Sequence, residues 1–193
     1  MNERLASIIV NTTIFLSTVG ILITYCFQEG HWDLKKGRDA FRYFTTLSNA
    51  LVAICAAGMV IAQLCGEVPE AVRMLKYVGT HAVTVTLLTV LFFLGPSAGY
   101  RLMLARSNFY MHLAGPLLAI ASYCFLEKRE LSFARSLWGL LPVALYGAVY
   151  LYKVVYAPKE KRWEDFYGFN RNGHWPISYI AIHMLALAVC ALL

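Results

Sequence analysis

Long apolar stretches alternate with short polar ones along the whole chain. The apolar stretches predict helices over about 5–28, 43–66, 77–96, 108–126, 136–157 and 176–193. An α-helix rises about 1.5 Å per residue, so roughly 20 apolar residues cross a hydrocarbon core of about 30 Å. The pattern therefore predicts an all-α polytopic membrane protein, a bundle of six transmembrane helices. Because the connecting loops are too short to hold a further domain, residues 1–193 are expected to form a single transmembrane domain.

The amino-acid composition agrees with a membrane protein. The chain is 59% hydrophobic and 15% charged, whereas a soluble domain carries about 25% charged residues. The basic residues occur in short loops and form no patch interleaved with aromatic residues, so membrane lipids are the expected partners and nucleic acid is not. The first apolar stretch is longer than the core of a cleavable signal peptide and no small-x-small site follows it, so it is expected to remain as a helix.

The charge distribution predicts an orientation. Six spans place both termini on one side of the membrane, and most of the 17 Lys and Arg residues fall in the first, third and fifth loops. Positive loops favour the cytoplasmic side, which predicts that both termini lie outside. The short loops and the lack of an organelle signal favour a plasma or inner membrane.

A polar segment, FRYFTTLSN, stands where the second predicted helix begins. Thr45, Ser48 and Asn49 follow an i, i+3, i+4 spacing and share one helix face, while Thr46 points elsewhere. Such residues commonly cap a helix or hydrogen-bond to a neighbouring helix, and that interpretation remains open.

Two histidines are expected near the depth of this polar face. His112 enters the membrane from the same side as Thr45, and His183 enters from that side in the last helix. A hydroxyl, an imidazole and amide donors at one depth are the components of an acyl-transfer site. In such a site Thr45 would attack, His112 would take its proton, and Asn49 or backbone N–H groups would hold the oxyanion, with Ser48 and His183 in support.

Pro116 follows His112 by four residues. Proline removes a helical hydrogen bond, so a kink and a free carbonyl at His112 are expected beside the imidazole. Glu127, at the far end of the same helix and next to Lys128 and Arg129, is interpreted as an interfacial charge.

Two alternatives to an ester hydrolase remain open. The first is a non-catalytic lipid-binding or small-molecule transport protein, in which Thr45 and His112 line different walls of a cavity. The second is a haem electron carrier with His112 and His183 as the axial pair. The five cysteines lack a CxxC or Cys/His metal spacing, so no metal site is expected from them, and the hydrolase is expected to use no cofactor. The sequence does not indicate an oligomeric state.

Tyr43-Phe44-Thr45, together with Met111-His112 followed by Pro116, resembles the androgen-induced protein family of six-helix membrane proteins. The resemblance implies a threonine hydrolase that cleaves fatty acid esters of hydroxy fatty acids, with Thr45 as the nucleophile and His112 as the base. Ser48-Asn49 replaces the acidic residue of the family, and the histidine-to-proline spacing is one residue shorter. The segment from Glu164 to Phe169 is similar only loosely to the family's motif after the fifth helix.

Overall fold

The computed structural model describes residues 3–28, 30–127 and 130–193. Within these ranges six helices are long and apolar enough to cross a membrane: Glu3–Cys26, Phe44–Leu64, Glu70–Ala98, Ser107–Glu127, Phe133–Tyr156 and Trp175–Leu192. The predicted all-α fold with six membrane-spanning helices is therefore confirmed. The chain divides into two compact units, Met1–Glu130 (unit 1) and Leu131–Leu193 (unit 2), and each is described by itself.

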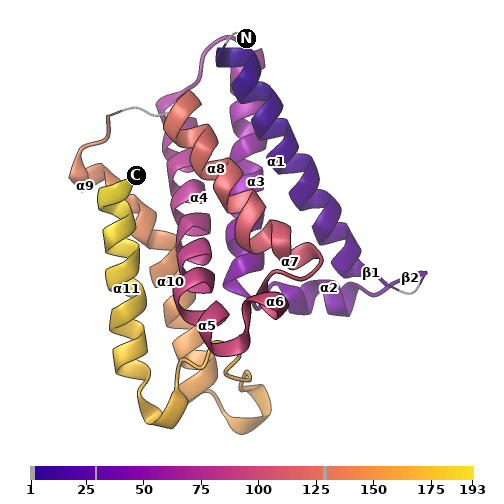
Figure 1. Cartoon of the computed structure of the whole chain (residues 1–193), viewed down its shortest axis with the longest axis vertical. Coiled ribbons are helices and arrows are strands. Elements are labelled where there is room, and N and C mark those ends of the chain that lie inside the picture. The colour runs from indigo at the N-terminus through magenta and orange to yellow at the C-terminus, as the bar shows by residue number, and fades with distance from the viewer. Residues whose placement is uncertain (1–2, 29, 128–129) are drawn as a thin grey trace. The chain divides into compact units, whose positions relative to one another are not determined.

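Unit 1 contains the first four spans (Figure 1). Its elements are α1 (Glu3–Cys26), β1 (Phe27–Gln28), β2 (His31–Trp32), α2 (Leu34–Ala40), α3 (Phe44–Leu64), α4 (Glu70–Thr89), η1 (Val90–Leu94), α5 (Gly95–Ala98), α6 (Tyr100–Met103), α7 (Ser107–Phe109), η2 (Tyr110–Ala114), α8 (Gly115–Ser122) and η3 (Tyr123–Glu127). The two short strands pair antiparallel, with Phe27 opposite Trp32. The elements η1, η2 and η3 are π-helical turns within the third and fourth spans.

The core of unit 1 lies among α1, α3, α4 and α8. It consists of the buried side chains Ile14, Val52, Ala56, Val83 and Ala119. Small residues let membrane helices approach closely. Gly79 of α4 is such a position, because a Cβ atom there would stand 3.0 Å from the Cα of Val52 on α3.

The third span begins earlier than the apolar pattern predicted. Its first helix starts at Glu70, directly after the extended residue Pro69, and not near residue 77. An acidic residue in the first turn suits the positive end of the helix dipole. The prediction stopped at the charges of Arg73 and Lys76, yet the helix continues through both residues, and Lys76 finds partners inside the protein.

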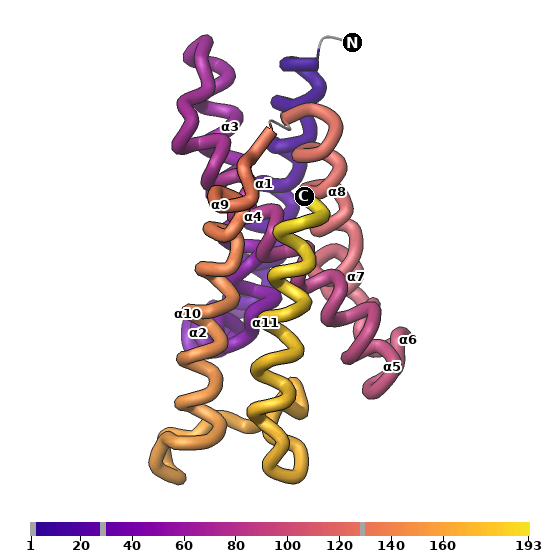
Figure 2. Tube along the Cα trace, turned by 90° about the vertical axis from the view of Figure 1, so that its left-hand side faces the viewer, coloured from indigo at the N-terminus to yellow at the C-terminus, as the bar shows by residue number. Residues whose placement is uncertain are grey.

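Unit 2 contains the last two spans and the long loop between them. Its elements are α9 (Phe133–Ser136), η4 (Leu137–Gly139), α10 (Leu140–Leu151), η5 (Tyr152–Tyr156), η6 (Lys159–Lys161), η7 (Arg171–Gly173) and α11 (Trp175–Leu192). The helices α10 and α11 lie side by side (Figure 2). The Asp165 carboxylate ties the loop to α10, since it accepts hydrogen bonds from the Tyr150 hydroxyl at 3.0 Å and from the Phe169 and Asn170 amides at 2.8 and 2.7 Å.

Candidate functional site

Thr45 and His112 lie in hydrogen-bond contact within unit 1. Thr45 is the second residue of α3, and His112 lies in the π-helical turn η2 that precedes α8. The Thr45 Oγ1 is 3.3 Å from the His112 Nε2. The start of α3 and the segment from α5 to α7 occupy the same end of unit 1 (Figure 1). The pair therefore sits near one face of the membrane-spanning bundle, 67 residues apart in sequence.

The backbone of Met103 determines the tautomer of the imidazole. The His112 Nδ1 lies 2.6 Å from the Met103 carbonyl oxygen. A carbonyl only accepts, so the Nδ1 carries the hydrogen and donates it. In the neutral ring the Nε2 is then unprotonated, and the Thr45 hydroxyl donates to it. Threonine, imidazole and carbonyl thus form a chain in which the imidazole is oriented to accept the threonine proton.

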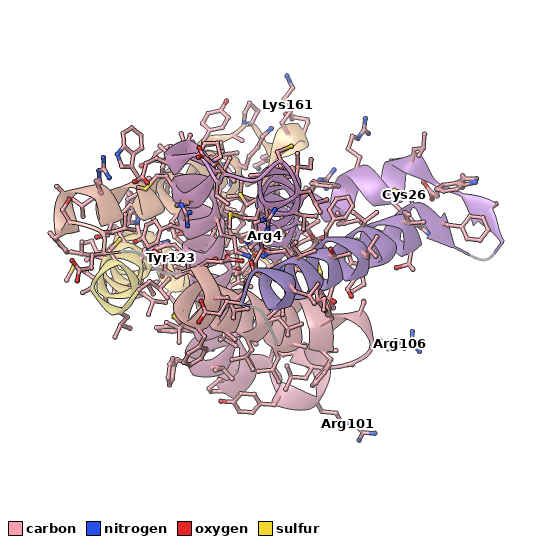
Figure 3. The ribbon with its side chains drawn as sticks, turned by 90° about the horizontal axis from the view of Figure 1, so that it is seen from above. Arg4, Cys26, Arg101, Arg106, Tyr123 and Lys161 are labelled. Atoms are coloured by element: carbon pink, nitrogen blue, oxygen red, sulfur yellow. The ribbon has the colours of Figure 1, made fainter. Side chains whose placement is uncertain are left out.

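A reversal of the chain brings Met103 to the imidazole. Gly99, between α5 and α6, has a φ of +94°, a conformation that favours glycine. After this turn the short helix α6 ends at Met103, and Arg106, with a φ of +52°, leads into α7. The side chains of Arg101 and Arg106 extend outward from this segment (Figure 3).

The π turn and Pro116 together leave the Met111 carbonyl without a helical N–H donor, and Asn49 donates to it. In η2 the Gly115 N–H bonds to the Tyr110 carbonyl, five residues back. The next N–H in this register would bond to Met111, but residue 116 is proline and has none. The Asn49 Nδ2 donates to the Met111 carbonyl instead, at 2.9 Å. The missing helical hydrogen bond is therefore the one from residue 116 to the Met111 carbonyl. In a regular α-helix it would have been the one to the His112 carbonyl, as the sequence predicted.

Asn49 is fully buried and fixes the geometry of the threonine. Its Nδ2 also donates to the Thr45 carbonyl at 2.8 Å, so both amide hydrogens are used on backbone oxygens. An oxyanion would have to be held by other donors while these two bonds persist. Asn49 thus joins α3 to η2 through the carbonyls of Thr45 and of Met111, the neighbour of His112.

Ser48 is also buried and also engaged. Its hydroxyl lies 3.1 Å from the Thr45 carbonyl and 2.8 Å from the Thr86 Oγ1 of α4. Thr46, which was expected on another face of the helix, is buried as well. Tyr43 is the N-cap of α3 and forms no side-chain cap, and Thr45 lies inside the first turn, so the hydroxyl of Thr45 is not the helix cap.

His183 belongs to unit 2. Its Nδ1 lies 2.8 Å from the Tyr179 carbonyl, one turn earlier on α11, and its ring packs on the Tyr179 ring with centroids 4.2 Å apart. The structure brings Thr45, Ser48, Asn49 and His112 together in unit 1, and places His183 in the other unit.

The described residues contain no group of three or more His, Cys, Asp or Glu side chains that could hold a metal ion. The five cysteines all lie within the described residues and form no disulfide there. Both ring nitrogens of His112 have partners, so ligation of a haem iron through the Nε2 would first have to displace the Thr45 hydroxyl.

A second polar cluster, not anticipated from the sequence, lies toward the opposite end of unit 1. Lys76 of α4 and Glu127 of η3 form an ion pair with Nζ and Oε2 3.6 Å apart, and their side chains are only 1% and 2% exposed. Asn11 accepts from the Lys76 Nζ at 2.6 Å, while Ser7 and Ser122 donate to the Glu127 Oε1 at 2.7 and 2.9 Å. Glu127 stands at the end of its span, where it was expected, but these polar side chains bury and pair it, which the sequence did not predict.

No family model, curated protein or solved structure matches the chain.

Proposed function

We propose that the protein is a membrane-embedded hydrolase of lipid-like esters, with Thr45 as the nucleophile and His112 as the general base. The observation that carries the proposal is the 3.3 Å contact of the Thr45 Oγ1 with an imidazole whose other nitrogen is held by the Met103 carbonyl. An activated hydroxyl needs an adjacent base that is itself oriented by a third group. A non-catalytic cavity protein needs no such contact between the two residues.

In the first half of the reaction Thr45 takes the acyl group. The Thr45 Oγ1 attacks the ester carbonyl as its proton passes to the His112 Nε2. The tetrahedral intermediate then expels the alcohol, which receives that proton from the Nε2. The result is an acyl-threonine and a neutral imidazole. The Met103 carbonyl supports the transient imidazolium, because it accepts the Nδ1 hydrogen throughout.

In the second half water releases the acid. His112 takes a proton from water, the hydroxide attacks the acyl-threonine, and the Nε2 returns the proton to the Thr45 oxygen. The carboxylic acid leaves, and the enzyme is restored. General base catalysis of this kind contributes roughly 10²- to 10⁴-fold to a rate.

The start of α3 provides the electrostatic support for the oxyanion. The first N–H groups of a helix have no acceptor within that helix, and the helix dipole is positive there. The N–H of Thr45 itself, the second residue of α3, is such a group. Fixed donors aimed at a developing oxyanion supply a large part of the stabilisation in acyl transfer.

The proposed substrate and location follow from the surroundings of the pair. A reacting hydroxyl within a bundle of apolar spans meets substrates that partition into the bilayer, so the acyl chain would enter from the lipid. We assign the protein to a plasma or inner membrane with both termini outside, on the basis of the Lys and Arg distribution among the loops.

Purified protein assayed with a panel of fatty acyl esters, and labelled with a fluorophosphonate probe, tests the proposal. Thr45→Ala is expected to abolish both turnover and labelling, and Thr45→Ser to retain both. His112→Ala is expected to lower turnover by about 10²-fold or more. Thr24→Ala and His174→Ala are matched controls at exposed positions. Full turnover in both Thr45→Ala and His112→Ala would rule out the proposed hydrolase mechanism and favour a lipid-binding protein.

A further inference from the structure

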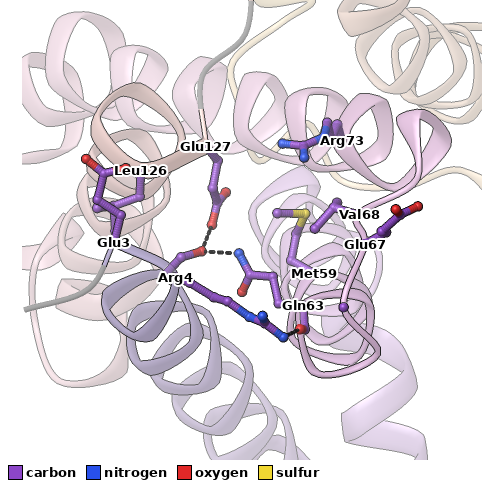
Figure 4. Close-up of a pocket in the computed structure, with 11 residues that line it drawn as sticks. Glu3, Arg4, Met59, Gln63, Glu67, Val68, Arg73, Leu126 and Glu127 are labelled. Atoms are coloured by element: carbon purple, nitrogen blue, oxygen red, sulfur yellow. Dashed lines mark hydrogen bonds between the residues drawn. The ribbon is translucent and has the colours of Figure 1, made fainter.

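A pocket opens at the end of unit 1 opposite the Thr45–His112 pair. It has a volume of about 490 Å³ and lies among the start of α1, the ends of α3 and η3, the start of α4, and the loop that joins α3 to α4 (Figure 4). This volume falls within the range of about 300–1,000 Å³ that is typical of small-molecule sites. The lining residues stand where spans begin and end, so the pocket lies at the level of the lipid headgroups.

Three buried polar atoms of lining residues have no hydrogen-bond partner among the described residues. They are the Gln63 Oε1, the Arg73 Nε and the Glu127 Oε2, and the Glu127 Oε2 takes part in the ion pair with Lys76 at 3.6 Å. Gln63 is 8% exposed and Glu127 is 6% exposed, so neither side chain is satisfied by bulk water. Leaving a buried polar group unpaired costs about 1–3 kcal/mol. Two of the atoms accept and one donates, so a complementary ligand brings N–H or O–H donors together with an acceptor.

The Gln63 side-chain amide is held in place by a hydrogen bond from its nitrogen. Its Nε2 donates to the Ser7 hydroxyl at 2.7 Å, which leaves the Oε1 as the end that remains available. Arg4 donates to the Gln63 backbone carbonyl and braces the same turn of α3 from α1. The acceptor is thus rigidly positioned before a ligand arrives.

The charges around the pocket balance. Lys76 lies behind the lining and neutralises Glu127. The remaining charged lining residues are two carboxylates, Glu3 and Glu67, and two guanidinium groups, Arg4 and Arg73. A simple anion or a simple cation meets repulsion from one of these pairs, while a ligand that carries both signs meets attraction from each.

We propose that this pocket binds a zwitterion that joins a primary ammonium to a phosphate, the chemistry of a phosphoethanolamine lipid headgroup. The ammonium donates to the Gln63 Oε1 and the Glu127 Oε2, and the phosphate accepts from the Arg73 guanidinium. A choline headgroup has the same charges but no N–H, so it leaves both acceptors without a hydrogen bond, and the Glu127 Oε2 keeps only its ion pair with Lys76. The pocket therefore selects ethanolamine over choline, because a site built to hydrogen-bond rejects a ligand that lacks the donor.

Titration of the detergent-solubilised full chain with dihexanoyl phosphatidylethanolamine and dihexanoyl phosphatidylcholine tests the proposal. The ethanolamine lipid is expected to bind at least about tenfold more tightly, since each lost hydrogen bond to a charged group weakens binding by about that factor or more. Free phosphoethanolamine forms the third arm. Binding equal to that of the lipid supports the same chemistry and identifies a soluble zwitterion as the source, and weaker binding identifies the lipid.

Variants locate the site. Arg73→Gln and Glu67→Gln are each expected to weaken binding of the ethanolamine lipid, Arg73→Gln by at least about tenfold. Arg101→Gln and Glu160→Gln, at exposed positions that do not line the pocket, are expected to leave binding unchanged. Equal affinity for the two lipids, no binding of any probe, or binding unaffected in both folded pocket variants would overturn the proposal. The lipid comparison uses the unmodified chain and does not depend on whether a variant folds.

Discussion

The Asn49 Nδ2 stands 2.9 Å from the carbonyl oxygen of Met111, which lacks a helical partner because Pro116 has no N–H. Pro116 thus leaves the Met111 carbonyl without a helical donor, and Asn49 uses that carbonyl to join α3 to η2. Asn49 also donates to the Thr45 carbonyl, so its two hydrogen bonds together position the Thr45 hydroxyl relative to the His112 imidazole.

A double-mutant cycle tests this coupling. Asn49→Ala is expected to destabilise the protein by about 1–3 kcal/mol, because it leaves the Met111 carbonyl buried and unpaired. In a Pro116→Ala background the restored N–H at residue 116 gives the helix an internal donor, so the same substitution is expected to cost less. Unfolding of the four proteins in detergent measures the difference. Equal costs in the two backgrounds would mean that the two residues act independently.

The tautomer of His112 can be read without any assay of activity. Nitrogen NMR of the labelled protein is expected to show a protonated Nδ1 and an unprotonated Nε2 at neutral pH, because the Met103 carbonyl accepts the Nδ1 hydrogen. Thr45→Ala removes the donor to the Nε2 and is expected to shift only that resonance. A protonated Nε2 in the unmodified protein would contradict the assignment of His112 as the base. His112→Ala identifies the signals, and His174→Ala is the control.

The buried ion pair predicts an asymmetry between single and double substitutions. Glu127→Gln leaves the Lys76 ammonium unpaired inside the bundle, and Lys76→Met leaves the Glu127 carboxylate unpaired. Each is expected to destabilise unit 1 by about 3–5 kcal/mol. The double variant removes both charges and is expected to recover most of that loss. A double variant as unstable as the sum of the single ones would show that the two charges do not compensate each other.

The start of α2 carries a cap that depends on pH. The Asp33 carboxylate accepts from the Lys36 N–H at 3.0 Å, and this hydrogen bond holds the pKa of Asp33 below its usual value of 3.8. A carboxyl with a lowered pKa stabilises the fold above its unfolded pKa, and the effect is lost as pH falls through the folded pKa, below 3.8. Amide exchange at Lys36 is therefore expected to be slower than in Asp33→Ala at neutral pH, and the two rates are expected to converge in strong acid. Asp39→Ala, in the same helix, is the control.

Apolar runs predict the spans well, because a membrane span is a local property of about 20 residues. The shared face of Thr45, Ser48 and Asn49 and the depth of His112 follow from helical geometry for the same reason. The Met103 carbonyl could not be foreseen, since a backbone acceptor has no residue signature and depends on the turn at Gly99. The rule that charges end a span also failed at Lys76, whose partner Glu127 lies 51 positions farther along the chain.

The Lys76–Glu127 pair also bears on the order in which the protein can be made. The two charges lie on consecutive spans, where the third begins and the fourth ends, and an unpaired charge buried within the protein there carries a desolvation cost. During synthesis the third span, with Lys76, is made before the fourth span, which carries Glu127. The neutral pair exists only once both spans are present, so the third and fourth spans enter the bilayer most favourably as a hairpin. A nascent chain that stops short of Glu127 would carry a destabilised third span and be a substrate for membrane quality control.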